Sequence, residues 1–64
     1  MIINGKNESL ERNMTLAELL EQLGYRQNLV AVELNGQIVK RAEYVSTMIT
    51  VSDKLEIVSF VGGG

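Results

Sequence analysis

The stretch MTLAELLEQLG, residues 14–24, decides the fold of this 64-residue chain. Its leucines fall at i, i+3, i+4 and i+7, a spacing that places them on one face of a helix over residues 16–23. They are Leu16, Leu19, Leu20 and Leu23. An apolar helix face needs a second layer to bury it. We therefore expect all four leucines to lie in the core.

Both ends of this helix are marked in the sequence. Thr15 stands at the N-cap position, and Glu18 follows at the spacing of a capping box. Met14 and Leu19 have the spacing of a hydrophobic staple. Gly24 can take the left-handed conformation that ends helices. The start, face and stop signals agree on one short helix.

Two Asn-Gly pairs, Asn4-Gly5 and Asn35-Gly36, predict β-hairpins, because type I′ turns need positive φ at both central positions. The strands joined by these turns are expected over residues 1–3, 6–12, 29–34 and 37–39. The strand over residues 6–12 is polar and low in β propensity, so we place it at a sheet edge.

The last predicted strand covers residues 55–60. It carries Leu55 and Ile57 on one face and Val58 and Phe60 on the other. Apolar residues on both faces favour a central position in the sheet. The helix would cover the first face, and the second would be partly exposed.

Before that strand, residues 41–48 are expected to be irregular with one short helical turn, and residues 49–51 to be briefly extended. The order of elements favours an α+β fold of the β-grasp, or ubiquitin-like, type. In this fold one main helix packs on a mixed four- to five-stranded sheet. We expect residues 1–60 to form this domain and residues 61–64 to form a flexible glycine tail.

The chain ends with Val61, Gly62, Gly63 and Gly64. Glycine has no Cβ, so the tail is slim enough to thread into a narrow partner cleft. Four extended residues reach about 13 Å. This suggests that the carboxylate of Gly64 reacts in a partner's active site. A frayed chain end is an equally reasonable interpretation of the tail alone.

The composition excludes several other functions. The chain has no cysteine and no histidine, so the usual zinc ligands and nucleophile–base pairs are missing. We expect no catalytic residue and no metal site. A net charge of −2 argues against nucleic-acid binding and mildly favours basic partner clefts. The sequence has no membrane-spanning stretch and no signal peptide, so we expect a cytoplasmic protein.

Six short segments lie along the whole chain in a characteristic order and spacing: Ile3-Asn4-Gly5, residues 15–20, residues 30–35, Ile38-Val39 with Arg41, residues 55–58 and residues 60–64. Together they resemble the ThiS family of sulfur carriers in thiamine biosynthesis. Three positions depart from the family pattern. Lys40 replaces a frequent proline, Tyr44 a frequent tryptophan and Ser52 a usual glycine.

The resemblance implies that the chain is a carrier and not an enzyme. A ThiF-like adenylyltransferase, related to ubiquitin-activating enzymes, would adenylate Gly64 using ATP and Mg²⁺. A sulfur donor protein would convert the adenylate to a thiocarboxylate. A ThiG-like thiazole synthase would accept the sulfur. No cofactor would be bound by this chain, and no nucleic acid or membrane would be a partner.

Two side chains on the last strand are candidates for partner docking. Phe60 and Val58 could form an exposed apolar surface beside the tail. A second small core under residues 41–48 is the competing interpretation, and it is favoured for Val58. Tyr44 is expected to pack, with its hydroxyl group reaching solvent or backbone.

Three other functions fit a β-grasp domain with a glycine tail. The small subunit of molybdopterin synthase uses the same activation but is usually longer. A ubiquitin-like modifier would transfer Gly64 to lysines of target proteins. An interaction domain would not use the tail at all.

Overall fold

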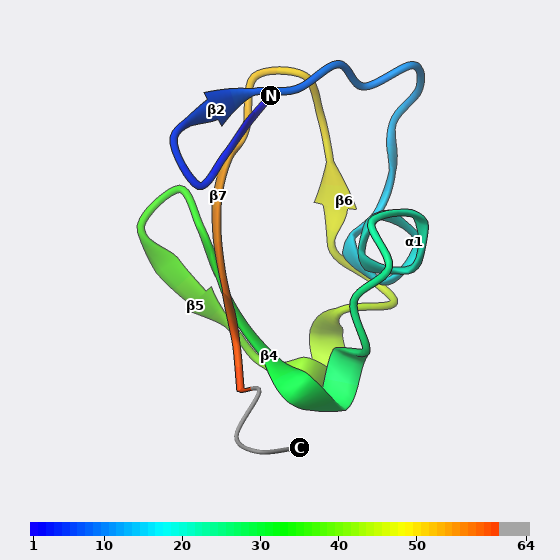
Figure 1. The fold of residues 1–64 in the computed structure, drawn as a ribbon. Helices are drawn as coiled ribbons and strands as arrows, with labels where there is room; N and C mark the ends of the chain where they lie inside the picture. The colour runs from blue at the N-terminus through cyan, green and yellow to red at the C-terminus, as the bar shows by residue number, and fades with distance from the viewer. Residues whose placement is uncertain (61–64) are drawn as a thin grey trace.

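The computed structural model describes residues 1–60. Their secondary structure is shown in Figure 1. The elements are β1 (Ile2–Ile3), β2 (Lys6–Asn7), β3 (Met14–Thr15), α1 (Leu16–Gln22), η1 (Gln27–Leu29), β4 (Val30–Leu34), β5 (Gln37–Val39), η2 (Arg41–Glu43), β6 (Met48–Ile49) and β7 (Lys54–Ser59), where η denotes a 3₁₀ turn.

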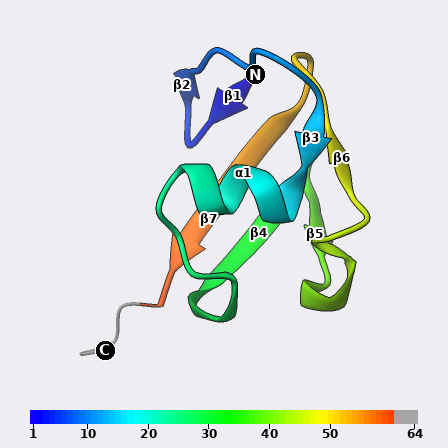
Figure 2. The ribbon, with the colours of Figure 1, turned by 90° about the vertical axis from the view of Figure 1, so that its right-hand side faces the viewer.

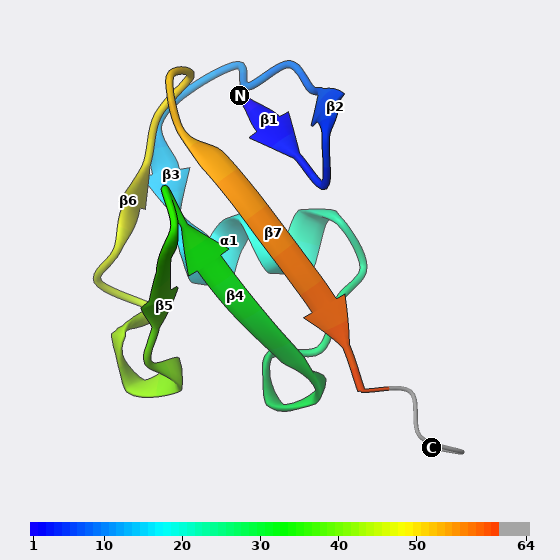
Figure 3. The same ribbon diagram turned by 90° about the vertical axis from the view of Figure 1, so that its left-hand side faces the viewer.

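Five strands form the main sheet in the order β2-β1-β7-β4-β5. The β1–β7 pair is parallel, and the other pairs in this sheet are antiparallel. The helix α1 crosses one face of this mixed sheet, as Figures 2 and 3 show from opposite sides. This is the β-grasp arrangement, and the prediction that the last strand is central is confirmed.

The predicted helix start is confirmed by its cap. The Thr15 hydroxyl group accepts a hydrogen bond from the Glu18 N–H at 3.1 Å, and Glu18 Oε1 accepts one from the Thr15 N–H at 2.9 Å. At the other end, Gly24 has a φ of +85°, the left-handed conformation expected there. These local contacts satisfy backbone groups that a helix end leaves unpaired.

Three of the four leucines are buried as predicted, but Leu23 is 43% exposed. The helix ends at Gln22, and Leu23 lies at its C-cap. There it borders a hollow lined also by Met1 and Ile3. The prediction for Leu23 is wrong because the two-residue strands β1 and β2 leave this end of the helix without a full covering layer.

Both Asn-Gly turns have the predicted geometry, with φ of 51° and 83° in the first and 52° and 87° in the second. The strand after the first turn is a true edge strand, but it covers only Lys6–Asn7 and not residues 6–12. Its partner β1 is equally short. Beyond β2 the Glu8 N–H still donates to the Met1 carbonyl at 2.8 Å, and the pairing with the start of the chain ends there because the sequence begins at Met1.

A second sheet of two strands was not predicted. β3 pairs with β6 through Met14↔Ile49 and Thr15↔Met48. The strand β6 lies near the extended piece predicted at residues 49–51, but its pairing with the helix entrance carries no periodic signal. This pair ties the start of α1 to the segment that follows η2.

The core lies between α1 and the inner face of the main sheet. Its buried members are Ile3, Met14, Leu16, Leu19, Leu20, Val30, Val32, Tyr44, Ile49, Leu55 and Ile57. Tyr44 is 2% exposed, and its hydroxyl group donates to the Val30 carbonyl at 3.3 Å. The expectation that Tyr44 packs with its hydroxyl group on the backbone is confirmed.

Candidate functional site at the end of the central strand

The strand β7 leads to the tail and is held on both of its edges. It pairs with β1 on one side and with β4 on the other, up to the pair Val30↔Ser59. The Asn4 side chain lengthens the β1 ladder. Its Oδ1 accepts from the Ile57 N–H at 2.7 Å, and its Nδ2 donates to the Ile57 carbonyl at 3.2 Å. The sequence pattern marked Asn4 only as a turn residue and gave no sign of these two hydrogen bonds.

Phe60 is the last described residue, and its N–H donates to the Leu29 carbonyl at 2.7 Å. Leu29 ends η1, which is in turn joined to η2 because Arg41 Nε donates to the Gln27 carbonyl at 3.0 Å. Both 3₁₀ turns lie at the end of the molecule where β7 finishes (Figure 1). The point from which the tail departs is therefore held by η1, and η2 supports η1.

The predicted reactive residue Gly64 and the predicted threading residues Val61, Gly62 and Gly63 lie outside the described residues. What the structure places is the base of the tail. This base is formed by Ser59 and Phe60 with the turns around them.

Val58 and Phe60 are 58% and 51% exposed. They alternate with the buried Leu55 and Ile57, so they lie on the sheet face opposite α1. A second small core on this face would bury Val58. Since Val58 is more than half exposed, that prediction is wrong.

The segment expected to cover Val58 packs elsewhere. Residues 41–48 lie against the start of α1, where the Leu16 N–H donates to the Thr47 carbonyl at 2.7 Å and the Ala17 N–H to the Tyr44 carbonyl at 3.0 Å. These bonds hold the segment beside the helix entrance and leave the outer sheet face open.

Further apolar side chains join Val58 and Phe60 on this outer face. Val58 stands opposite Ala31, and Ile38 stands opposite Glu33 on the neighbouring strand. Ile38 is 75% exposed. Figure 3 looks onto this face, where β7, β4 and β5 lie side by side. We call Ala31, Ile38, Val58 and Phe60 the outer patch.

Asp53 has a lowered pKa and a structural explanation for it. Partial burial by itself would raise this pKa, but hydrogen bonds to the ionised carboxyl group outweigh burial. The Asn35 side chain donates to Oδ1 at 2.9 Å, and the Thr50 N–H donates to Oδ2 at 2.8 Å. These bonds fasten the turn before β7 to the second hairpin, so Asp53 is a structural carboxylate.

Stability should depend on pH through Asp53. Its pKa in the folded protein lies below the ordinary value of 3.8, so the ionised group stabilises the fold above that pH. This contribution is lost as pH falls through the folded pKa. We expect the free energy of unfolding, measured with urea, to fall less between about pH 6 and about pH 2.5 in Asp53→Asn and in Asn35→Ala than in the wild type. An unchanged acid dependence in both variants would contradict this role.

Glu18 also has a lowered pKa. The largest cause is the hydrogen bond from the Thr15 N–H; desolvation opposes it, and the Thr15 hydroxyl group and the nearby Arg12 add smaller lowering effects. Arg12 Nη2 lies 3.8 Å from Glu18 Oε2 in an exposed ion pair. The shift belongs to the helix cap and indicates no reaction.

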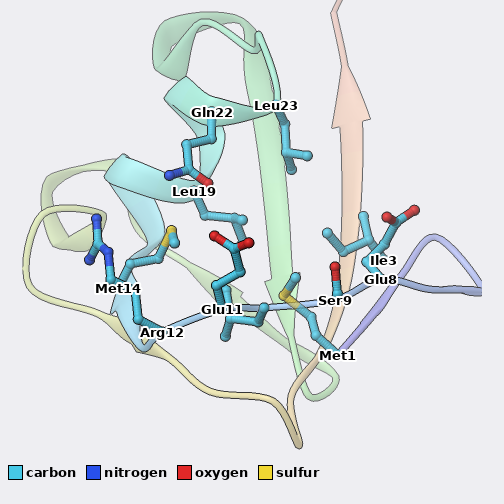
Figure 4. A pocket seen from close by; sticks show the side chains of 11 residues that line it. Met1, Ile3, Glu8, Ser9, Glu11, Arg12, Met14, Leu19, Gln22 and Leu23 are labelled. Carbon is cyan, nitrogen blue, oxygen red and sulfur yellow. The ribbon is translucent and has the colours of Figure 1, made fainter.

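No group of three or more His, Cys, Asp or Glu residues is placed to hold a metal ion within residues 1–60. None of the described helices is long and apolar enough to cross a membrane. A hollow of about 240 Å³ lies between α1 and the loop before β3 (Figure 4). Apolar side chains including Met1, Leu19 and Leu23 line it together with Glu8 and Glu11, and it belongs to the exposed end of the helix face.

The sequence model of the ThiS family matches residues 1–64. The chain belongs to the ThiS family. This confirms the resemblance drawn from the order of its motifs.

Individual ThiS relatives agree with this membership. The chain is 33% identical over 63 residues to the sulfur carrier protein ThiS of Bacillus subtilis, covering 97% of this chain and 96% of that protein. The crystal structure of the thiamine biosynthesis protein ThiS from Geobacter metallireducens has a TM-score of 0.83 and 33% identity. The match covers 98% of this chain and 96% of that one.

The chain is also similar to part of a larger protein. It is 42% identical over 64 residues to a thiazole synthase of Paramagnetospirillum magneticum. The chain spans about a fifth of the length of the two thiazole synthases that it matches.

Proposed function

We propose that this ThiS-family protein carries sulfur as a thiocarboxylate on Gly64 and donates it for thiazole formation in thiamine biosynthesis. The match of the family model over all 64 residues, through the final Gly-Gly-Gly, is the observation that carries the proposal. The protein acts as a co-substrate of partner enzymes and not as an enzyme itself.

Activation takes two steps at the end of the chain. The Gly64 carboxylate attacks the α-phosphorus of ATP, with Mg²⁺ bound by the partner, and pyrophosphate leaves. Sulfide (HS⁻) released by a donor protein then attacks the acyl carbon and displaces AMP, and loss of the S–H proton leaves the thiocarboxylate. A carboxylate is a poor electrophile, so the adenylate supplies the leaving group. Stabilising phosphate charge is the work of the ThiF-like partner.

This chain contributes presentation of the reacting group. Val61 joins the tail to the body, and Gly62 and Gly63 keep the space around the acyl carbon free of side chains. Two observations support this division of labour. The described body is a small domain with one buried core, and β7 is held by β1 and Asn4 as far as Ile57 and by β4 and η1 as far as Phe60.

A ThiG-like thiazole synthase is the proposed sulfur acceptor. Support comes from the thiazole synthase of Paramagnetospirillum magneticum, which contains a segment similar to this entire chain. A synthase and a carrier that meet repeatedly to pass sulfur would benefit from being close together.

The direct test records the intact mass of the protein after incubation with ATP, Mg²⁺, a ThiF-like adenylyltransferase and a sulfide source. A mass increase equal to replacing one oxygen atom by sulfur, mapped to Gly64, supports the proposal. Thiazole formation with a ThiG-like acceptor then identifies the pathway. An unmodified mass with a partner proven active on another carrier would refute the proposal.

We also propose that the outer patch, through Phe60 and Val58, docks the partner that receives the tail. The patch begins at the tail base, and its large side chains Ile38, Val58 and Phe60 are each at least half exposed, whereas Leu55 and Ile57 on the inner face are buried. A few residues near the centre of an interface carry most of its binding energy, and truncating one of them costs about 2 kcal/mol or more.

We expect Val58→Ser with Phe60→Ser to raise the KM for adenylation by about tenfold or more. The melting temperature should change little, because both side chains are at least half exposed. Val51→Ser with Val45→Ser is the matched control, since these side chains are 61% and 66% exposed and lie outside the outer patch. Equal KM values for the two double variants would remove the outer patch from the interface.

A further inference from the structure

The net charge of −2 conceals an uneven distribution of charge. The basic residues divide into two groups of three at opposite ends of the molecule. Arg26, Lys40 and Arg41 flank the two 3₁₀ turns at the tail base. Arg26 is the N-cap of η1, Lys40 is the N-cap of η2 and Arg41 begins η2. Figures 1 to 3 all place these turns at the end where β7 finishes.

The other three basic residues lie at the far end. Lys6 belongs to β2, Arg12 to the loop before β3, and Lys54 begins β7. All six basic side chains are exposed. The two groups therefore differ in place and not in number or burial.

The carboxylates are not divided in this way. Glu43 in η2 accompanies the basic group at the tail base. At the far end, Asp53 precedes β7 and Glu8 and Glu11 lie in the loop before β3, while Glu18 and Glu21 lie on α1. These five positions leave the far end and the helix with the excess of negative charge.

Two more carboxylates, Glu33 and Glu56, stand opposite each other on the outer face. Glu56 precedes Phe60 by four residues, about 13 Å along an extended strand. The described tail end thus carries three cationic side chains and one carboxylate, a local charge of opposite sign to that of the whole chain.

We infer that Arg26, Lys40 and Arg41 form a basic rim that docks against a carboxylate-rich surface around the partner's cleft for the tail. The inference rests on the proposed function, because only a partner that takes the tail must approach this end. The overall charge had favoured basic partner clefts, but the local charge at the point of contact favours acidic ones.

Geometry supports a common role for the rim. The Arg41 guanidinium group is positioned by its bond to the Gln27 carbonyl, only two residues before the Leu29 carbonyl that holds Phe60. The rim and the base of the tail are therefore parts of one braced unit. Charges at the edge of an interface mainly accelerate association and select orientation, and salt weakens their effect.

The test compares two triple variants with identical net charge. Arg26→Gln, Lys40→Gln and Arg41→Gln remove the rim, and Lys6→Gln, Arg12→Gln and Lys54→Gln remove the far group. Each triple changes the net charge from −2 to −5. We expect the rim triple to lower kcat/KM for adenylation by about tenfold at an ionic strength of about 0.03 M, and the difference to shrink at about 0.5 M. The far triple should stay within about twofold of wild type.

Arg41→Lys keeps a positive charge at this position but removes the guanidinium Nε that donates to the Gln27 carbonyl. It therefore tests the charge separately from that hydrogen bond. It should retain a kcat/KM close to that of wild type. Equal losses in the two triples, or a loss in the rim triple that salt does not change, would overturn the basic rim. A wild-type chain that an active adenylyltransferase does not modify would instead refute the proposed function, and the inference with it.

Discussion

Deleting Gly64 is expected to abolish formation of the thiocarboxylate while leaving the melting temperature close to that of wild type. The proposed chemistry occurs at the terminal carboxylate, and removing one residue shortens the reach of the tail by about 3.3 Å. A displacement of that size takes the carboxylate away from the position for attack on ATP. The core, in contrast, is built from residues no later in the chain than Ile57.

Intact-mass measurement after the activation reaction checks the loss of thiocarboxylate formation, and thermal unfolding checks the melting temperature. A variant extended by one alanine after Gly64 is the matched partner of the deletion, because it keeps every native residue and only moves the carboxylate. It too should fail to form a thiocarboxylate. A marked fall in melting temperature for the deletion would show that the tail belongs to the core. Full activity of the extended variant would show that the terminal carboxylate is not the reacting group.

Replacing Leu20 by alanine should destabilise the domain by about 2 to 5 kcal/mol. Leu20 has no exposed surface and lies in the middle of the leucine face that α1 presses against the sheet. The loss combines the transfer free energy of the missing carbons with the cavity they leave. A domain of 64 residues has little stability to spare, so this variant should be largely unfolded near physiological temperature.

Leu23→Ala is the matched control for Leu20→Ala. It is the same substitution on the same predicted helix face, but Leu23 is 43% exposed and should cost about 1 kcal/mol or less. Urea unfolding of both variants gives the two free energies directly. Equal losses would mean that Leu23 is buried in solution or that Leu20 is not, and either result would contradict the packing of α1.

Local signals in the sequence predicted most of the architecture. The capping box at Thr15, the stop at Gly24 and the two Asn-Gly turns depend on contacts within a few residues, so each can be inferred from spacing alone. The central position of the last strand followed from apolar residues on both of its faces. These features were enough to predict the β-grasp fold.

The errors concern contacts between distant segments. Leu23 continues the leucine face in sequence, but the covering layer ends before it. Val58 was expected under residues 41–48, yet hydrogen bonds to Leu16 and Ala17 hold that segment beside the helix. The role of Asn4 as an extension of the β1–β7 ladder is likewise a contact across 53 positions.

The helix, the two hairpin turns and the central last strand follow from the sequence, because short-range geometry and hydrophobic periodicity are written into neighbouring positions. The pairing of β3 with β6 follows only from the tertiary structure. The tertiary structure alone decided which apolar residues stay exposed and how charge is distributed around the tail base. Arg26 and Arg41 are far apart in the chain, and only folding brings η1 and η2 together. Surface charge adds up over residues that are close in space, so a chain with a net charge of −2 can carry a basic rim where its tail begins.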